Sequence, residues 1–160
     1  MAQSSNRKTA LILAVVAVLA AVVRFFMKGW VEPLGVPTIV GSLLASVTVV
    51  VLIGLVLLFR REGRNAEGSY IRAALWFAGF AGWCEVLVIA GILVTERTGA
   101  DTYFSGPWEV VYRAFPTPSA HVIGHTQGFF IRLVIGFILG AIVYGVAKRS
   151  RDRASGPASA

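Results

Sequence analysis

Apolar residues along this chain gather in four long runs and do not alternate with polar ones. The runs cover residues 9–27, 38–59, 73–95 and 128–147. Each run is close to the length of about 20 residues that a helix needs to cross a bilayer. Apolar segments of this length, with at most one charge each, predict transmembrane helices. With the flanking residues that continue the helical pattern, the predicted helices cover about 9–27, 38–59, 70–95 and 117–149.

The composition supports a membrane protein. Only 14% of the 160 residues are charged, against about a quarter in a soluble domain, and 56% are hydrophobic. The mean hydropathy is +0.74. The first run could be a signal peptide, since Arg7 and Lys8 precede it. However, it continues to Met27 and no Ala-x-Ala motif follows, so we expect a retained helix.

The basic residues predict an orientation. Ten of them flank the runs on one side: two before the first run, four between the second and third, and four after the fourth. On the other side stand only Lys28, Arg97 and Arg113. The positive-inside rule therefore places both termini in the cytoplasm. We expect the membrane to be a prokaryotic plasma membrane. This orientation requires an even number of spans.

The predicted fold is thus all-α: a polytopic membrane protein with a four-transmembrane-helix bundle, N-in and C-in. Residues 1–8 form a cytoplasmic N-terminus, 9–153 the membrane domain and 154–160 a disordered tail. The loop over 61–69 is expected to be a solvated turn. The net charge of +7 lies in blocks beside apolar runs. It therefore favours anionic lipids at the cytoplasmic face over nucleic acid as a partner.

The outer loop before the fourth run carries a short amphipathic pattern. Gly106-Pro107 can open a helix over about 107–115. One apolar stripe on it is formed by Trp108, Val111, Tyr112 and Phe115. The segment is either an interfacial helix on the membrane surface or a lid over the bundle. Thr117 is then the predicted N-cap of the last helix, with Pro118 in its first turn.

Three charges lie within the apolar runs, all in the predicted outer half of the bilayer: Arg24, Glu85 and Arg132. A charge at this depth costs several kcal/mol unless it is paired or hydrated, so it marks a candidate site. We predict that Glu85 pairs with Arg132, and that His121 and His125 line the outer entrance above them. Two structural alternatives stay open. Arg24 can snorkel to lipid phosphate, and the pair can serve only to lock two helices.

No metal site or cofactor is predicted. His121 and His125, at i and i+4, are weak metal candidates, because zinc takes three or four protein ligands. Bis-histidine haem is disfavoured, since both histidines lie on one helix. The segment Pro118-Ser119-Ala120-His121 resembles the PSGH element of lipid-phosphate phosphatases, but the downstream histidine and arginine element is absent. Cys84 is the only cysteine and is expected to be a packing residue.

Small residues predict where helices approach each other. Gly136 and Gly140 form a GxxxG motif in the fourth helix, and Gly79 and Gly82 play the same part in the third. This much small-residue surface is compatible with a homo-oligomer or with a place in a larger membrane complex.

Three functions remain open at this point. The favoured one is a non-enzymatic transporter, channel or membrane subunit that uses Glu85, Arg132 and Arg24 in an outward-facing cavity. The alternative is a membrane-embedded enzyme or redox or metal-accessory subunit that uses His121 and His125 at the outer face. A purely structural subunit would have its charges fully paired and no cavity.

Overall fold

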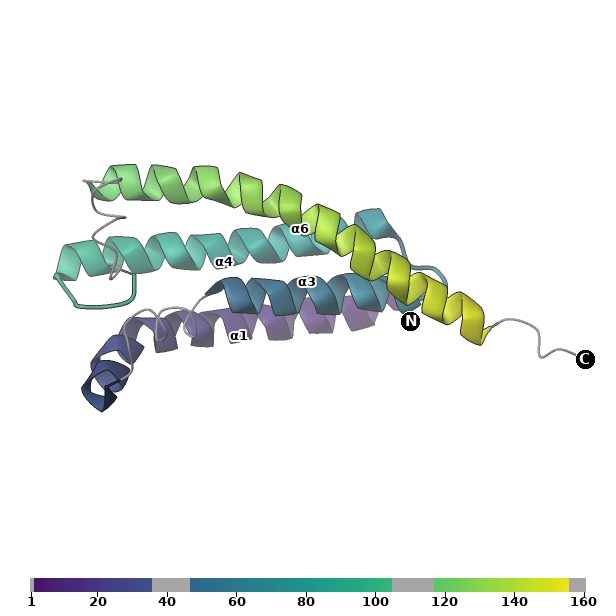
Figure 1. Ribbon diagram of the computed structural model, residues 1–160, viewed down its shortest axis with the longest axis horizontal. Coiled ribbons are helices and arrows are strands. Elements are labelled where there is room, and N and C mark those ends of the chain that lie inside the picture. The colour runs from purple at the N-terminus through teal and green to yellow at the C-terminus, as the bar shows by residue number, and fades with distance from the viewer. Residues whose placement is uncertain (1, 36–46, 105–116, 156–160) are drawn as a thin grey trace, which may run out of the picture.

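All regular structure in the described part of the chain is helical. The computed structural model describes residues 2–35, 47–104 and 117–155 (Figure 1). Its elements are α1 (Ala2–Val31), a 3-10 turn η1 (Glu32–Leu34), α3 (Val47–Arg64), α4 (Tyr70–Thr98) and α6 (Pro118–Ala154). The four α-helices lie side by side, and α1 begins at the end of the bundle where α6 finishes (Figure 1). The all-α prediction is confirmed.

Three of these helices are long and apolar enough to span a membrane: Arg7–Trp30, Tyr70–Thr98 and Ser119–Ala154. The second predicted span is described only from Val47, because residues 38–46 lie outside the described part. The predicted helix over 107–115, with Trp108, Val111, Tyr112 and Phe115, also lies outside it, and so do residues 156–160 of the predicted tail.

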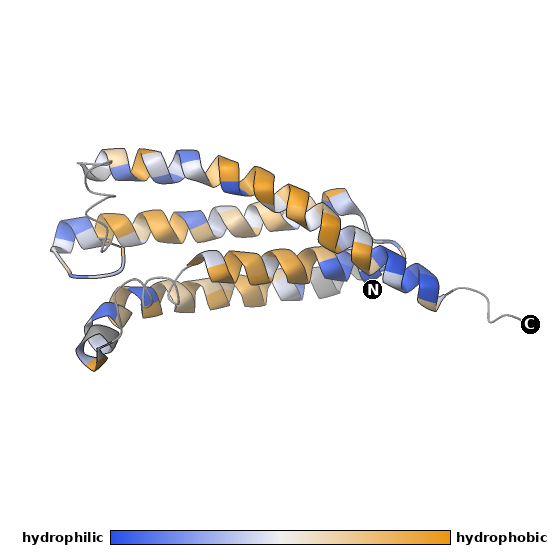
Figure 2. Cartoon of the chain, viewed as in Figure 1, coloured by the Kyte–Doolittle hydropathy of each residue, from blue (hydrophilic) through white to orange (hydrophobic). Residues whose placement is uncertain are grey.

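The outward faces of the bundle are apolar. Large exposed hydrophobic side chains include Leu11, Leu19, Phe26, Ile131, Ile138 and Ile142. Figure 2 shows hydrophobic residues along the middle of the helices and hydrophilic ones in the last turns of α6. Exposing such a surface to water costs free energy, whereas the hydrocarbon of a bilayer solvates it.

The helices extend beyond their apolar runs. α1 starts at Ala2 and α6 continues to Ala154, because a helix ends where its backbone is capped and not where its apolar surface ends. α4 stops at Gly99, whose φ of 65° is a left-handed conformation that glycine adopts readily. α6 starts at Thr117, whose hydroxyl accepts a hydrogen bond from the backbone N–H of Ala120.

α3 and α4 form the centre of the bundle, since each packs against both α1 and α6. Glycines lie on the face of α6 that contacts these two helices. A Cβ added at Gly140 would lie 2.4 Å from the ring of Phe59, and one at Gly136 would lie 2.5 Å from the ring of Phe77. Both rings are fully buried, so they have little room to move. The two glycines of the GxxxG motif therefore lie where α6 meets aromatic side chains.

Gly79 and Gly82 do not bring helices together within the chain. A Cβ added at either would meet no atom within 4 Å among the described residues. Gly54 on α3 has the close contact instead, at 2.2 Å from the ring of Phe80. The reason is geometric: a small-residue pattern shows which residues share a face, but not which face meets the neighbouring helix.

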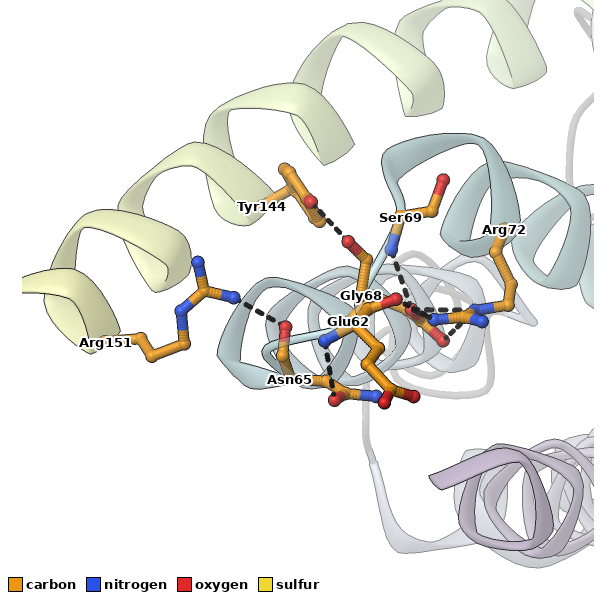
Figure 3. A network of polar contacts seen from close by, with 8 residues as sticks. Glu62, Asn65, Gly68, Ser69, Arg72, Tyr144 and Arg151 are labelled. Carbon is orange, nitrogen blue, oxygen red and sulfur yellow. Dashed lines mark hydrogen bonds and ion pairs between the residues drawn. The ribbon is translucent and has the colours of Figure 1, made fainter. Parts of the chain in front are cut away.

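The segment over 61–69, predicted to be a solvated turn, is not simply solvated, because α3 continues through it to Arg64 and only a short turn leads on to α4. Glu62 is buried, with 1% of its surface exposed (Figure 3). Its carboxylate accepts hydrogen bonds from Arg72 Nε at 3.0 and 3.1 Å and from the backbone N–H of Ser69 at 3.1 Å. A buried carboxylate requires such partners, because lost hydration has to be replaced.

The same turn is joined to α6. The hydroxyl of Tyr144 donates to the carbonyl of Gly68 at 2.9 Å, and Arg151 donates to the carbonyl of Asn65 at 2.6 Å (Figure 3). Both acceptors are backbone carbonyls that no helix satisfies. We call this set of contacts, together with Glu62, the turn network. It fastens α3, α4 and α6 at one end of the bundle.

Glycine packing predicts opposite effects at two positions. Gly140→Ala should destabilise the protein by about 1–3 kcal/mol, because the added methyl group overpacks the contact with Phe59. Gly79→Ala is the matched control and should be neutral or stabilising by up to about 1 kcal/mol, since alanine favours a helix. Unfolding in mixed micelles measures both. Equal losses would contradict the packing described here and would indicate that a second chain covers Gly79.

The turn network predicts a further difference. Glu62→Ala should lower the free energy of unfolding by about 1–3 kcal/mol, because Arg72 and the Ser69 N–H lose their acceptor. Glu67→Ala removes an exposed carboxylate from the same turn, and Arg72 contacts only the backbone carbonyl of Glu67. It should change stability by less than about 0.5 kcal/mol. Thermal unfolding in detergent compares the two, and a Glu62 variant as stable as the wild type would refute the assignment.

Candidate functional site

A cavity of about 180 Å³ lies between the helices, and all four of them contribute to its wall. Its polar or reactive lining residues are Arg24 from α1, Thr48 from α3, Cys84 and Glu85 from α4, and His125 and Arg132 from α6. The rest of the wall is formed by aliphatic and phenylalanine side chains, including Phe77 and Leu133. We call this space the charged cavity.

Glu85 and Arg132 meet at the cavity wall. Arg132 Nη2 lies 3.0 Å from Glu85 Oε2 and 3.3 Å from the carbonyl oxygen of His125, about two turns earlier on α6. The carboxylate is largely buried, with 13% of the side chain exposed, whereas 47% of the arginine side chain is accessible. One guanidinium group therefore joins α4 to α6 and still reaches the open part of the cavity.

His125 faces the other oxygen of the same carboxylate. Its Nδ1 lies 3.5 Å from Glu85 Oε1, which is longer than a normal hydrogen bond. Both atoms are inaccessible and form no hydrogen bond within the described structure. A small displacement of either side chain would let them share a proton. His121 lies one turn away, with its ring centroid 5.2 Å from that of His125.

Arg24 lines the cavity but binds elsewhere. Its Nη2 donates to the carbonyl of Tyr103 at 3.0 Å, and its guanidinium carbon lies 4.9 Å from the centre of the Phe104 ring. Within the described residues it has no ion pair with Glu85. The partners of Arg24 are thus a neutral carbonyl and a ring face, which orient its charge without cancelling it.

Sequence analysis missed the segment that holds Arg24. Tyr103 and Phe104 are buried although they follow the end of α4, and the Phe104 ring lies where a Cβ on Gly91 would be, at 2.6 Å. Thr95 and Thr102 share a hydrogen bond of 2.8 Å, and Asp101 pairs with Lys28. The available signal was a pair of adjacent aromatic residues shortly after Gly99, the glycine that caps the end of α4. Such a pair indicates that the segment turns back onto the bundle.

The histidines gain no further ligand. Within residues 2–35, 47–104 and 117–155, no group of three or more His, Cys, Asp and Glu side chains could hold a metal ion. Asp101, an acid in the described part of the loop that follows α4, pairs with Lys28. Glu109 lies outside the described residues.

Comparison of the chain with protein-family models, with curated proteins and with solved structures finds no match. The fold and surface define the class: a small helical protein whose helices have the apolar character of membrane spans. Its function is therefore argued from the charged cavity.

The ion pair predicts thermodynamic coupling. Glu85→Gln and Arg132→Gln should each destabilise the bundle, and the double variant should lose less than the sum of both, with a coupling energy of about 0.5–3 kcal/mol. Removing Arg132 leaves the largely buried carboxylate of Glu85 without its guanidinium partner, which explains the sign.

The matched control combines Arg132→Gln with Glu96→Gln, an exposed acid three turns further along α4. These two changes should be additive. Unfolding in mixed micelles provides the measurement, and additive effects for Glu85 and Arg132 would contradict the role of their contact.

Proposed function

We propose that this protein is a four-spanning integral membrane protein of the transporter or channel type, with both termini in the cytoplasm. In this proposal the charged cavity lies in the outer half of the bilayer and binds a small polar solute. The observation that carries it is the cavity itself: four helices surround a space lined by two arginines, one glutamate and one histidine. Ionisable groups inside an apolar bundle mark substrate or ion pathways.

The balance of charge supports a solute with an anionic group. Arg132 is paired with Glu85, whereas Arg24 contacts a carbonyl and an aromatic ring. With neutral histidine, the cavity therefore carries an excess positive charge. Uncompensated charge is expensive in a low-dielectric space, so an entering anion or carboxylate is stabilised there.

The pair of Glu85 and Arg132 also gives an entering anion a way to change the contacts between α4 and α6. A competing anion can draw Arg132 away from Glu85, and the freed carboxylate can then move toward His125 Nδ1, which lies 3.5 Å from Oε1, and form a hydrogen bond with it. The alternative of an enzyme or metal-accessory subunit rests on His121 and His125, to which the described residues add no third ligand. The transporter interpretation is the better supported of the two.

Water access to the cavity is testable with thiol chemistry. In a Cys84→Ala background, Leu133→Cys places a thiol at the cavity, whereas Val134→Cys places one at the same depth on the exposed apolar face. A membrane-impermeant methanethiosulfonate should label position 133 from outside and leave 134 unreacted, because lipid excludes the charged reagent. Labelling of neither, or of both alike, would contradict a hydrated outward cavity.

Flux measurements test the solute class. Proteoliposomes of the wild type should equilibrate chloride or acetate gradients faster than protein-free liposomes and faster than those with Arg24→Gln. Ile12→Gln, an exposed α1 position away from the cavity, controls for a general polar change. Rates equal to those of empty liposomes for both anions would overturn the anion assignment, while the thiol experiment separately tests the cavity.

A further inference from the structure

The outward face of α3 forms a furrow between α1 and α6. Positions 53, 57, 60 and 64 lie within about 60° of one another at 100° per residue, and all four are exposed. α1 packs on one side of α3 and α6 on the other. The face begins with Ile53 and Leu57 and finishes with Arg60 and Arg64. The stripe thus changes from apolar residues to arginines along the length of α3.

Two grooves adjoin this basic end, and Arg60 and Arg64 line both. The groove toward α1 has a volume of about 320 Å³ and is also lined by Thr9, Leu57 and Arg61. The groove toward α6 has a volume of about 400 Å³ and is also lined by Ile142, Val143, Val146, Ala147 and Ser150. The groove toward α6 therefore has a mainly aliphatic wall, whereas the groove toward α1 is lined mainly by arginines, and the two meet at one pair of guanidinium groups.

These two arginines differ from their neighbours in having no internal partner within the described residues. Arg61 donates to Thr9, Arg72 is paired with Glu62, and Arg151 with Asp152. No hydrogen bond or ion pair to another described residue is formed by Arg60 or Arg64. Their positions at i and i+4 place both guanidinium groups on the same side of α3. The pair is available to a ligand with negative charge.

We propose that this furrow binds one anionic phospholipid, with its phosphate between Arg60 and Arg64 and its acyl chains along the apolar part of the α3 stripe and the aliphatic wall of the groove toward α6. Guanidinium groups match phosphate oxygens with paired N–H donors, and basic pockets between membrane helices hold anionic headgroups. The apolar walls favour a lipid over a free phosphate ion, because only a lipid buries Ile142 and Val146. Arg60 lies about 14 Å along α3 from Val51, the α3 residue nearest to it that lines the charged cavity, so the lipid site is separate from the proposed solute site.

Lipid binding to the purified full-length protein tests the proposal. Native mass spectrometry from detergent should show one phosphatidylglycerol bound per chain in preference to phosphatidylcholine. Arg60→Gln with Arg64→Gln should weaken phosphatidylglycerol binding about 10- to 30-fold. Arg149→Gln with Arg153→Gln is the matched control: it has the same spacing, exposure and charge change, but lines neither groove. It should change binding by less than about twofold.

Three results would overturn the site. Equal losses for the two double variants would show that binding follows overall charge and not the furrow. Equal binding of phosphatidylcholine would remove the role of the headgroup. Inorganic phosphate that competes at the same concentration as phosphatidylglycerol would show that the acyl chains contribute nothing. Circular dichroism of the Arg60 and Arg64 variant should match the wild type, because neither side chain has a partner within the described fold.

Discussion

Lipid offers no hydrogen bonds, so a carboxylate carried into an apolar bundle has to find its counter-charge within the protein. Glu85 meets this constraint through Arg132, and the rest of the cavity follows from that contact. The guanidinium group holds α4 against α6 and also contacts the carbonyl of His125. The ring of His125 lies beside the second carboxylate oxygen. The pair therefore orders the wall of the cavity as well as neutralising a charge.

The bundle uses the same kind of ion pair at one end and near its middle, with opposite consequences. Glu62 is enclosed by Arg72 and the backbone of Ser69, and the surrounding turn is fastened to α6 by Tyr144 and Arg151. Near Glu85, by contrast, one carboxylate oxygen and the facing nitrogen of His125 lack hydrogen bonds within the described structure, and open space adjoins them. A satisfied network stabilises one end. An incompletely satisfied one near the middle of α4 leaves room for a solute or water.

Much of the outline follows from the sequence, because apolar length and isolated charges report directly on the membrane environment. The helical fold follows from the length of the apolar runs. The cap at Thr117 follows from the Thr-Pro pair that opens α6. The proximity of Glu85 to Arg132 follows from two opposite charges in the same predicted half of the bilayer.

Burial of Glu62 could not be predicted this way, since an acid in a polar turn looks solvated until α4 and α6 are placed around it. Tyr103 and Phe104 pose the same difficulty, because their burial depends on how a loop returns to the bundle. Packing motifs do not predict which glycines lie at a helix contact. Gly79 and Gly136 belong to similar motifs, yet of the two only Gly136 faces a neighbouring helix among the described residues.

Water in the charged cavity is the property on which the whole account depends. With only two histidines in the chain, ¹⁵N-histidine labelling gives two side-chain signals, which a His121→Gln variant assigns. Water-edited solid-state NMR in lipid bilayers then measures how fast magnetisation passes from water to each ring. We expect rapid transfer to His125, comparable with that to exposed arginine side chains. Transfer to His125 as slow as that to lipid-facing valines would show a dry, closed bundle and contradict the proposed solute site.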